Sequence, residues 1–144
     1  MKVLVLFDGS DNAMRAVAFT SKLAQKAADL QVRILQVVEL WETGAWGFLT
    51  LPEGKQEELI GKARDRAAEG LKRAESLLAE KGVPVESVIL VGETIPEILE
   101  YAAQWQPDLI VMGSRGTGPI RELVLGGVCH KILQLAQYPV LVVK

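Results

Sequence analysis

The sequence contains one cysteine and one histidine in 144 residues, and this scarcity excludes several classes of fold and site. One cysteine cannot form a disulfide bond within the chain, and Cys129 with His130 cannot supply the ligands of a usual structural zinc site. The two residues are also adjacent, and neighbours on a helix point about 100° apart, so they cannot meet as nucleophile and base. We therefore expect no disulfide, no structural zinc and no thiol enzyme.

The sequence also lacks long apolar runs and a strong excess of one charge. Runs such as residues 3–7 and 109–112 are far shorter than the roughly 20 residues that span a bilayer. With 16 basic and 18 acidic residues, the net charge of −2 gives no electrostatic reason to expect nucleic acid or an anionic membrane as a partner. The chain begins with Met-Lys and shows no signal-peptide cleavage site, so we expect a cytoplasmic protein.

What the chain does contain is enough apolar sequence for one core. A hydrophobic content of 49% fits a single domain over residues 1–144. Short β-forming runs predict strands at residues 3–7, 32–38, 83–91, 109–112 and 140–143. Helical periodicity predicts helices from Asn12 after a Ser10 cap, at 55–81, at 94–105 and from about Gly127. This alternation favours an α/β fold with a parallel sheet and helices on both faces, in which the more polar strand 83–91 lies at an edge.

Two local features of this layout carry their own predictions. Thr94 and Glu97 match a capping box, which would begin the third helix. Residues 39–54 are expected to form a long irregular loop. Its aromatic residues Trp41, Trp46 and Phe48 suit a lid over a ligand, a partner surface or packing beneath the loop, and the sequence does not choose among these.

Ligands of open parallel sheets bind outside the carboxyl ends of the strands, where the winding direction reverses. Two polar turns with glycine follow predicted strands, namely Asp8-Gly9-Ser10 and the segment from Gly113 to Gly118. We expect these turns to be neighbours in space. Backbone N–H groups at such a strand end and at the start of the next helix are suited to bind an anion.

Two common phosphate motifs fail on the second turn. Gly113 and Gly118 have the spacing of a Walker A loop, but Pro119 and Ile120 occupy the positions of its Lys and its Ser or Thr. A dinucleotide fingerprint would need glycine where Arg121 stands. The turn therefore belongs neither to a P-loop enzyme nor to a dinucleotide-binding dehydrogenase.

A wider frame does fit: Gly113, two residues, Gly116, nine residues, Gly126. Together with the Asp8-Gly9-Ser10 turn and the closing strand after Tyr138-Pro139, it resembles the ATP-binding signature of the universal stress protein family along the whole chain. The resemblance implies an open, Rossmann-like, five-stranded parallel sheet of the adenine nucleotide alpha hydrolase-like type, with strand order 3-2-1-4-5. It also implies binding of ATP, with AMP or ADP as alternatives, and a bound Mg²⁺ or Mn²⁺ ion.

The resemblance assigns the nucleotide site residue by residue. It consists of Phe7, Asp8, Gly9, Ser10, Val38, Met112, Gly113, Arg115, Gly116, Gly126, Gly127 and Val128. Asp8 would meet the phosphates through the metal ion, or else would only hydrogen-bond its turn and cap the first helix. Val38 would hold adenine through its backbone and Met112 would lie near the base or ribose, although both residue types are also common in cores.

Two further members of this set carry predictions of their own. Arg115 would contact a phosphate or the ribose, unless it is a solvated surface residue. The family usually has Ser or Thr after its last glycine, and Gly127 in that position would cost one hydrogen bond, roughly 0.5–1.5 kcal/mol.

The resemblance implies a nucleotide-binding stress or signalling protein without enzymatic activity, acting as a homodimer. The expected dimer contact is the last strand, with Val140, Leu141, Val142 and Val143 meeting a second copy edge to edge. An alternative is a slow ATPase or phosphotransfer enzyme that uses the same pocket, although no P-loop lysine or obvious base is present. A third is a pocket that takes AMP or another adenylate, or no nucleotide.

Overall fold

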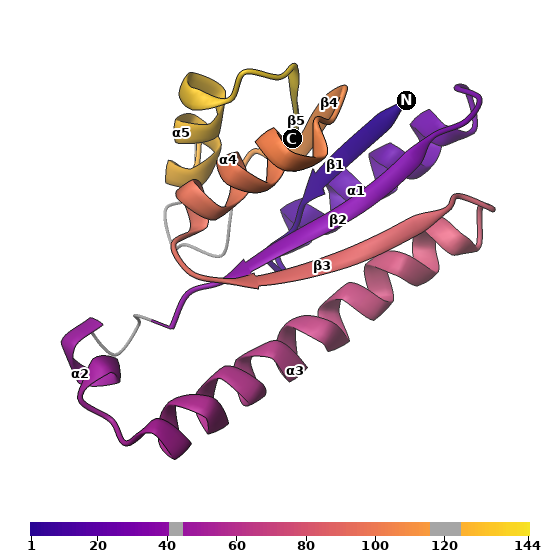
Figure 1. Cartoon of the computed structure of the whole chain (residues 1–144). Helices are drawn as coiled ribbons and strands as arrows, with labels where there is room; N and C mark the ends of the chain where they lie inside the picture. Colours follow the sequence, from indigo (N-terminus) through magenta and orange to yellow (C-terminus); the bar gives the residue numbers. More distant parts are fainter. Residues whose placement is uncertain (41–44, 116–124) are drawn as a thin grey trace.

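The computed structural model describes residues 1–40, 45–115 and 125–144. Its centre is a five-stranded sheet in which every pair is parallel, with the order β3-β2-β1-β4-β5 (Figure 1). The strands are β1 (Lys2–Leu6), β2 (Gln31–Val38), β3 (Val85–Val91), β4 (Leu109–Gly113) and β5 (Val140–Val143). The predicted sheet and its strand order are confirmed, with β3 at one edge and β5 at the other.

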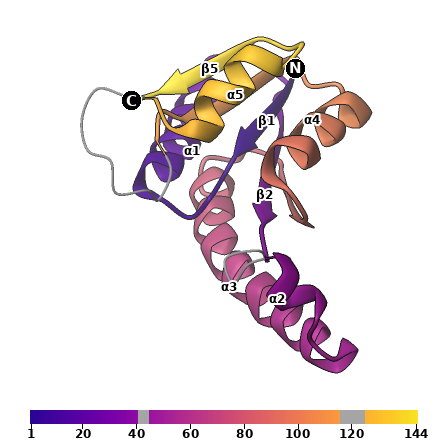
Figure 2. The ribbon, with the colours of Figure 1, turned by 90° about the vertical axis from the view of Figure 1, so that its left-hand side faces the viewer.

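Helices cover both faces of the sheet because residues of the central strands alternate between two cores. Val3 and Val5 of β1 pack with α1 (Asp11–Ala24) and α3 (Glu53–Ala79). Leu4 and Leu6 pack with α4 (Thr94–Trp105) and α5 (Gly127–Leu135) on the other face. Figure 2 shows α3 and α4 on opposite sides of β2.

The region expected as a long irregular loop contains a short helix, so that prediction was wrong in part. Helix α2 (Ala45–Leu49) lies within it, and α3 begins at Glu53, before the predicted start. Phe48 is buried, which agrees with packing beneath the loop, whereas the side chains of Trp41 and Trp46 lie outside the described residues. Figure 1 shows α2 and the first turns of α3 beyond the carboxyl end of β2.

The predicted caps had different outcomes. Ser10 caps α1 as expected, because its Oγ accepts a hydrogen bond from the N–H of Ala13 at 3.1 Å. The capping box at α4 was wrong. Thr94 is the first helical residue and Glu93 is the N-cap, with no hydrogen bond from its side chain. The carboxylate that caps this helix comes instead from Glu39, at the end of β2, as described below.

Candidate functional site

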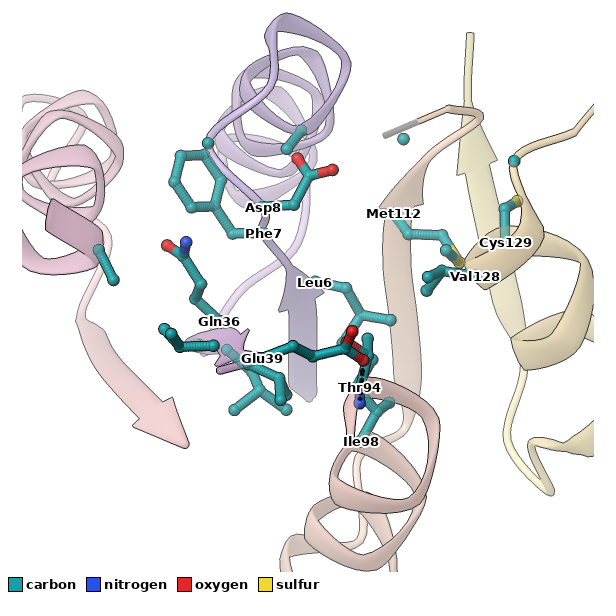
Figure 3. Close-up of a pocket in the computed structure, with 18 of the residues that line it drawn as sticks. Leu6, Phe7, Asp8, Gln36, Glu39, Thr94, Ile98, Met112, Val128 and Cys129 are labelled. Carbon is teal, nitrogen blue, oxygen red and sulfur yellow. Dashed lines mark hydrogen bonds between the residues drawn. The ribbon is translucent and has the colours of Figure 1, made fainter. Parts of the chain in front are cut away.

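A cavity of about 860 Å³ lies at the carboxyl ends of β1, β2 and β4 (Figure 3). It is within the range of about 300–1,000 Å³ that is usual for small-molecule sites. Of the residues assigned from sequence, those that line it are Phe7, Asp8, Gly9, Val38, Met112, Gly113, Arg115, Gly126, Gly127 and Val128. Ser10 is not among the lining residues, since its hydroxyl caps α1, and Gly116 lies outside the described residues.

The β1 turn presents a carboxylate to this cavity. Oδ1 of Asp8 accepts a hydrogen bond from the N–H of Ser10 at 2.9 Å, which fixes the turn. Gly9 between them has φ of +82°, in the left-handed region where a side chain would be strained. Asp8 is exposed and no hydrogen bond within the described residues involves its Oδ2. The side chain therefore holds the turn and keeps one oxygen available for a ligand.

Gly113 permits a close approach between β4 and the start of α1. A Cβ atom at this position would lie 2.7 Å from the carbonyl carbon of Asn12 and 2.8 Å from its oxygen. No real side chain tolerates such contacts with backbone, so glycine is required here for packing. This requirement brings the β4 turn beside the Asp8 turn, as the sequence predicted.

On the opposite wall, backbone N–H groups that donate to no other described residue belong to the first turn of α5. The N–H of Gly126 is already used, because it donates to the carbonyl of Ser114 at 2.9 Å. The first bond of the helix runs from the N–H of His130 to the carbonyl of Gly126. The N–H groups of residues 127–129 precede that bond and form the positive end of the helix dipole, which suits an anion.

The end of β2 forms the floor of the cavity. The carbonyl of Val38 accepts a hydrogen bond from the N–H of Gly92 at 3.1 Å, so its backbone faces β3. The carbonyl of Leu35 instead accepts from Phe7 at 2.9 Å and faces β1. Because strand residues alternate in this respect, Val37 also faces the β1 side, where β1 has ended. The predicted backbone role of Val38 stays a prediction, and the backbone that faces the β1 side is that of Val37.

Several lining residues were missed by the sequence interpretation. Ala63 and Ala67 lie on the apolar stripe of α3, which continues past the sheet edge and forms a wall of the cavity, with Arg66 beside it. Gln36 and Glu39 also line the cavity. A polar residue inside the apolar run of β2 is the signal that could have identified Gln36.

Among the described residues, the cavity is lined by one thiol and four charged side chains. Cys129 lines it, but burial raises the pKa of its thiol, so the neutral form dominates at physiological pH. The charged residues of the lining that the structure describes are Asp8, Glu39, Arg66 and Arg115. Within residues 1–40, 45–115 and 125–144, no three His, Cys, Asp or Glu side chains cluster as a metal site would require, and no helix is long and apolar enough to cross a membrane.

Comparison of the sequence with known families gives a match over residues 1–144 to the model of the universal stress protein family. The chain is 35% identical to universal stress protein YxiE of Bacillus subtilis, covering 99% of this chain and 98% of that protein. It is 33% identical to universal stress protein MJ0531 of Methanocaldococcus jannaschii, covering 99% and 81%.

Comparison of the structure gives the same kind of relatives. The structure of protein MJ0577 superposes with a TM-score of 0.85 at 28% identity, covering 99% of this chain and 94% of that one. An Arabidopsis thaliana family protein with AMP bound gives 0.72 at 20% identity, covering 100% and 91%. The Archaeoglobus fulgidus protein in complex with dAMP gives 0.67 at 24%, covering 100% and 98%.

Proposed function

The chain belongs to the universal stress protein family, and from this premise we propose that it is an ATP-binding member whose occupied and empty states differ in partner preference. The observation that carries the proposal is the cavity at the carboxyl strand ends, which joins an Asp8 oxygen and the N–H groups at the start of α5, all of them without a partner among the described residues. Relatives of this fold in complex with AMP and dAMP support an adenine nucleotide as the ligand class.

The arrangement of the walls suggests how the nucleotide lies. The base occupies the floor at the end of β2, where the backbone of Val37 faces the cavity. The phosphates lie toward Gly127, Val128 and Arg115, since N–H groups at a helix start and a guanidinium both attract anions. The two ends of the cavity thus offer different chemistry to the two ends of the ligand.

A Mg²⁺ or Mn²⁺ ion fits this arrangement only when it is bound together with the phosphates. Among the described residues Asp8 is the carboxylate beside the proposed phosphate position, and a single carboxylate with phosphate oxygens and water is a usual environment for Mg²⁺. The ion would supply charge neutralisation between Asp8 and the polyphosphate. The chain itself contributes the oxygen of Asp8 and the turn that orients it.

We propose binding without rapid turnover. Phosphoryl transfer requires several preorganised cations and a group that orients the nucleophile. The described lining contains two cationic side chains, Arg66 and Arg115, no lysine, and a neutral Cys129 thiol. Incubation with γ-labelled ATP and Mg²⁺ tests this point, and turnover near 1 per second or faster, the lower end for kinases, would reject it.

The binding proposal is tested by identifying nucleotide released from the denatured purified protein and by calorimetric titration with ATP, ADP and AMP, with and without Mg²⁺. The matched variants are Gly127→Asp and Gly127→Asn, because a Cβ at this position meets nothing within 4 Å. The aspartate places a negative charge at the helix start, which favours the helix but repels phosphate. We expect ATP affinity to fall with Asp and not with Asn. Absence of released nucleotide together with no binding of any of the three ligands would overturn the proposal.

A further inference from the structure

Glu39 is an acidic residue that directly follows the apolar end of β2 and lines the cavity. Strand side chains alternate between the two faces of a sheet, so Glu39 continues the face of Val37, whose side chain packs on the core beneath α4 and α5. The N–H of Thr94, the first residue of α4, donates to the Glu39 carboxylate at 2.8 Å, which agrees with this face. Figure 3 shows the Glu39 side chain extending from β2 to that bond.

The hydrogen bond from Thr94 orients the Glu39 carboxylate and uses only one of its oxygens. Oε1 accepts this bond, and no hydrogen bond or ion pair among residues 1–40, 45–115 and 125–144 involves Oε2. Glu39 is exposed and lines the cavity, so a ligand there can reach the side chain. A carboxylate accepts hydrogen bonds and donates none, so Oε2 requires a donor from the ligand.

The charge of Glu39 distinguishes the base end of the cavity from the phosphate end. The proposed phosphate position lies toward Gly127, Val128 and Arg115, where N–H groups and a guanidinium attract anions. A carboxylate repels phosphate, so Glu39 is suited to the opposite end of a nucleotide. The base carries neutral N–H donors, and these are the groups that Oε2 can bind.

The surroundings of this carboxylate suit a flat, largely apolar base. Leu6, Ile98 and Met112 are buried members of the core cluster on the α4 side of the sheet, and all three line the cavity. Small-molecule sites usually combine such apolar walls with a few polar groups that determine orientation and specificity. Glu39 is the charged group beside this wall in the described part of the lining.

We propose that Glu39 sets the base specificity of the cavity: its Oε2 accepts a hydrogen bond from the 6-amino group of adenine. This inference depends on the proposed function, since it places the base of a bound nucleotide at the end of β2. The 6-amino group has two N–H bonds, so one can go to Glu39 while the other remains for a backbone carbonyl such as that of Val37. A 6-oxo base presents an oxygen at the same place, and two acceptors would then face each other.

The test combines a change in the protein with a change in the base. Glu39→Gln keeps the length of the side chain and one oxygen that can accept from Thr94, so its NH₂ group turns to the cavity and offers a donor in place of the acceptor. Glu93→Gln is the matched control, because it removes the same charge from an exposed glutamate that neither caps α4 nor lines the cavity. Calorimetry gives the affinity of each protein for ATP and for inosine triphosphate, which has the same ribose and phosphates and a 6-oxo base.

We expect the wild type and Glu93→Gln to bind ATP about tenfold more tightly than inosine triphosphate, within the range for hydrogen bonds to the edge of a base. Glu39→Gln should bring the ratio of the two affinities close to one. The same ratio in the wild type and Glu39→Gln overturns the role of Glu39, and ATP binding by both proteins leaves the proposed function intact. A wild type that binds neither nucleotide overturns the proposed function and this inference with it.

Glu39→Ala separates base selection from capping of α4. It removes both the cap and the acceptor, whereas Glu39→Gln removes only the acceptor that faces the cavity. Base selection predicts that the ATP preference falls in both variants and falls further in Glu39→Gln, whose NH₂ group favours the 6-oxo base. If Glu39 served only as the cap, Glu39→Gln would keep the wild-type preference. The alanine variant provides the test on its own if the glutamine variant does not fold, and an unchanged preference in it overturns the proposal.

Discussion

The carboxylate of Glu39, at the end of β2, accepts a hydrogen bond from the backbone N–H of Thr94 at 2.8 Å. Thr94 is the first residue of α4, and the side chain of its N-cap residue Glu93 makes no capping bond. A residue from a different element, 55 positions away, thus satisfies one of the orphan donors of this helix. The contact fixes the start of α4 at the edge of the cavity at the carboxyl strand ends, which Glu39 and Thr94 both line.

Replacing this cap should destabilise the protein modestly. We expect Glu39→Ala to lower the free energy of unfolding by about 0.5–1 kcal/mol, the lower part of the range for cap removal, because the bond is exposed and water can replace it. Urea unfolding measures this value. Glu93→Ala is the control and should change it little, since Glu93 makes no capping bond. Equal effects of the two substitutions would contradict the assignment of Glu39 as the cap.

A hydroxyl at residue 127 should tighten ATP binding. By the family resemblance Gly127 stands where Ser or Thr is expected, and a Cβ there would meet nothing within 4 Å, so Gly127→Ser fits the structure. One added hydrogen bond, worth about 0.5–1.5 kcal/mol, corresponds to about 2- to 12-fold higher affinity. Gly127→Ala separates the hydroxyl from the effect of the Cβ. The prediction fails if calorimetry gives the alanine and serine variants the same affinity.

Removing the cation at residue 115 should weaken ATP more than AMP. Arg115 lines the cavity directly after the Gly113-Ser114 turn, and we place the outer phosphates there. Hydrogen bonds to charged groups are worth about 1.5–3 kcal/mol, so Arg115→Ala should weaken ATP binding at least tenfold. Arg115→Lys keeps the charge and should recover part of it. Equal losses of affinity for AMP and ATP would show that Arg115 does not contact the outer phosphates.

Much of this site could be predicted from sequence because its signals are local. Apolar strands that end at glycine, and the frame of Gly113 and Gly126, lie within short stretches of chain. Gly126 nevertheless has a different local role from the one its position suggested, since its N–H is occupied by Ser114. The donors available to an anion lie one to three residues later, and only the course of the backbone shows this.

The remaining contributions depend on the tertiary arrangement. Arg66 lies in a helix whose periodicity is that of an ordinary core-facing helix, and it reaches the cavity because α3 extends past the sheet. Glu39 looks like a loop residue until α4 is placed beside β2. The Thr94 and Glu97 pair matches the sequence pattern of a capping box. In the structure, however, the N–H of Thr94 donates to the distant carboxylate of Glu39.

Cys129 should behave as a protected thiol. It is 1% exposed, and burial raises its pKa above the ordinary value of 9.0. The thiol should therefore react with iodoacetamide much more slowly at pH 8.5 in the folded protein than in urea. A raised pKa in the folded state also means that its contribution to stability is present below pH 9 and is lost as pH rises above it.

The free energy of unfolding, measured at pH 8 and at pH 10, tests the direction of this pH dependence. The wild type should lose more stability over this interval than Cys129→Ala, in which the titrating group is absent. The alanine variant is the control for all other groups that titrate in the same range. The prediction of an unreactive Cys129 would be contradicted if the wild type lost no more stability than the variant. Rapid alkylation of the folded protein would also contradict it.

The proposed dimer can be tested through the backbone of β5. The carbonyls of Pro139 and Val143 accept hydrogen bonds from the N–H of Ile110 in β4 and the N–H of Ser114 directly after it, at 2.9 Å each. Backbone groups alternate along a strand, so those of Val142 face the open edge. Proline is tolerated on an edge strand where its missing N–H would have faced outward.

Val142→Pro should therefore leave the fold intact and remove a donor from the proposed edge-to-edge contact. We expect light scattering at micromolar protein to report a dimer for wild type and for Val142→Thr, which keeps the N–H, and a monomer for the proline variant. Circular dichroism verifies that the variant is folded. A monomeric wild type would reject the dimer outright. A folded, dimeric Val142→Pro protein would instead show that the two copies meet elsewhere, because an edge without this donor cannot complete the ladder across the two-fold axis.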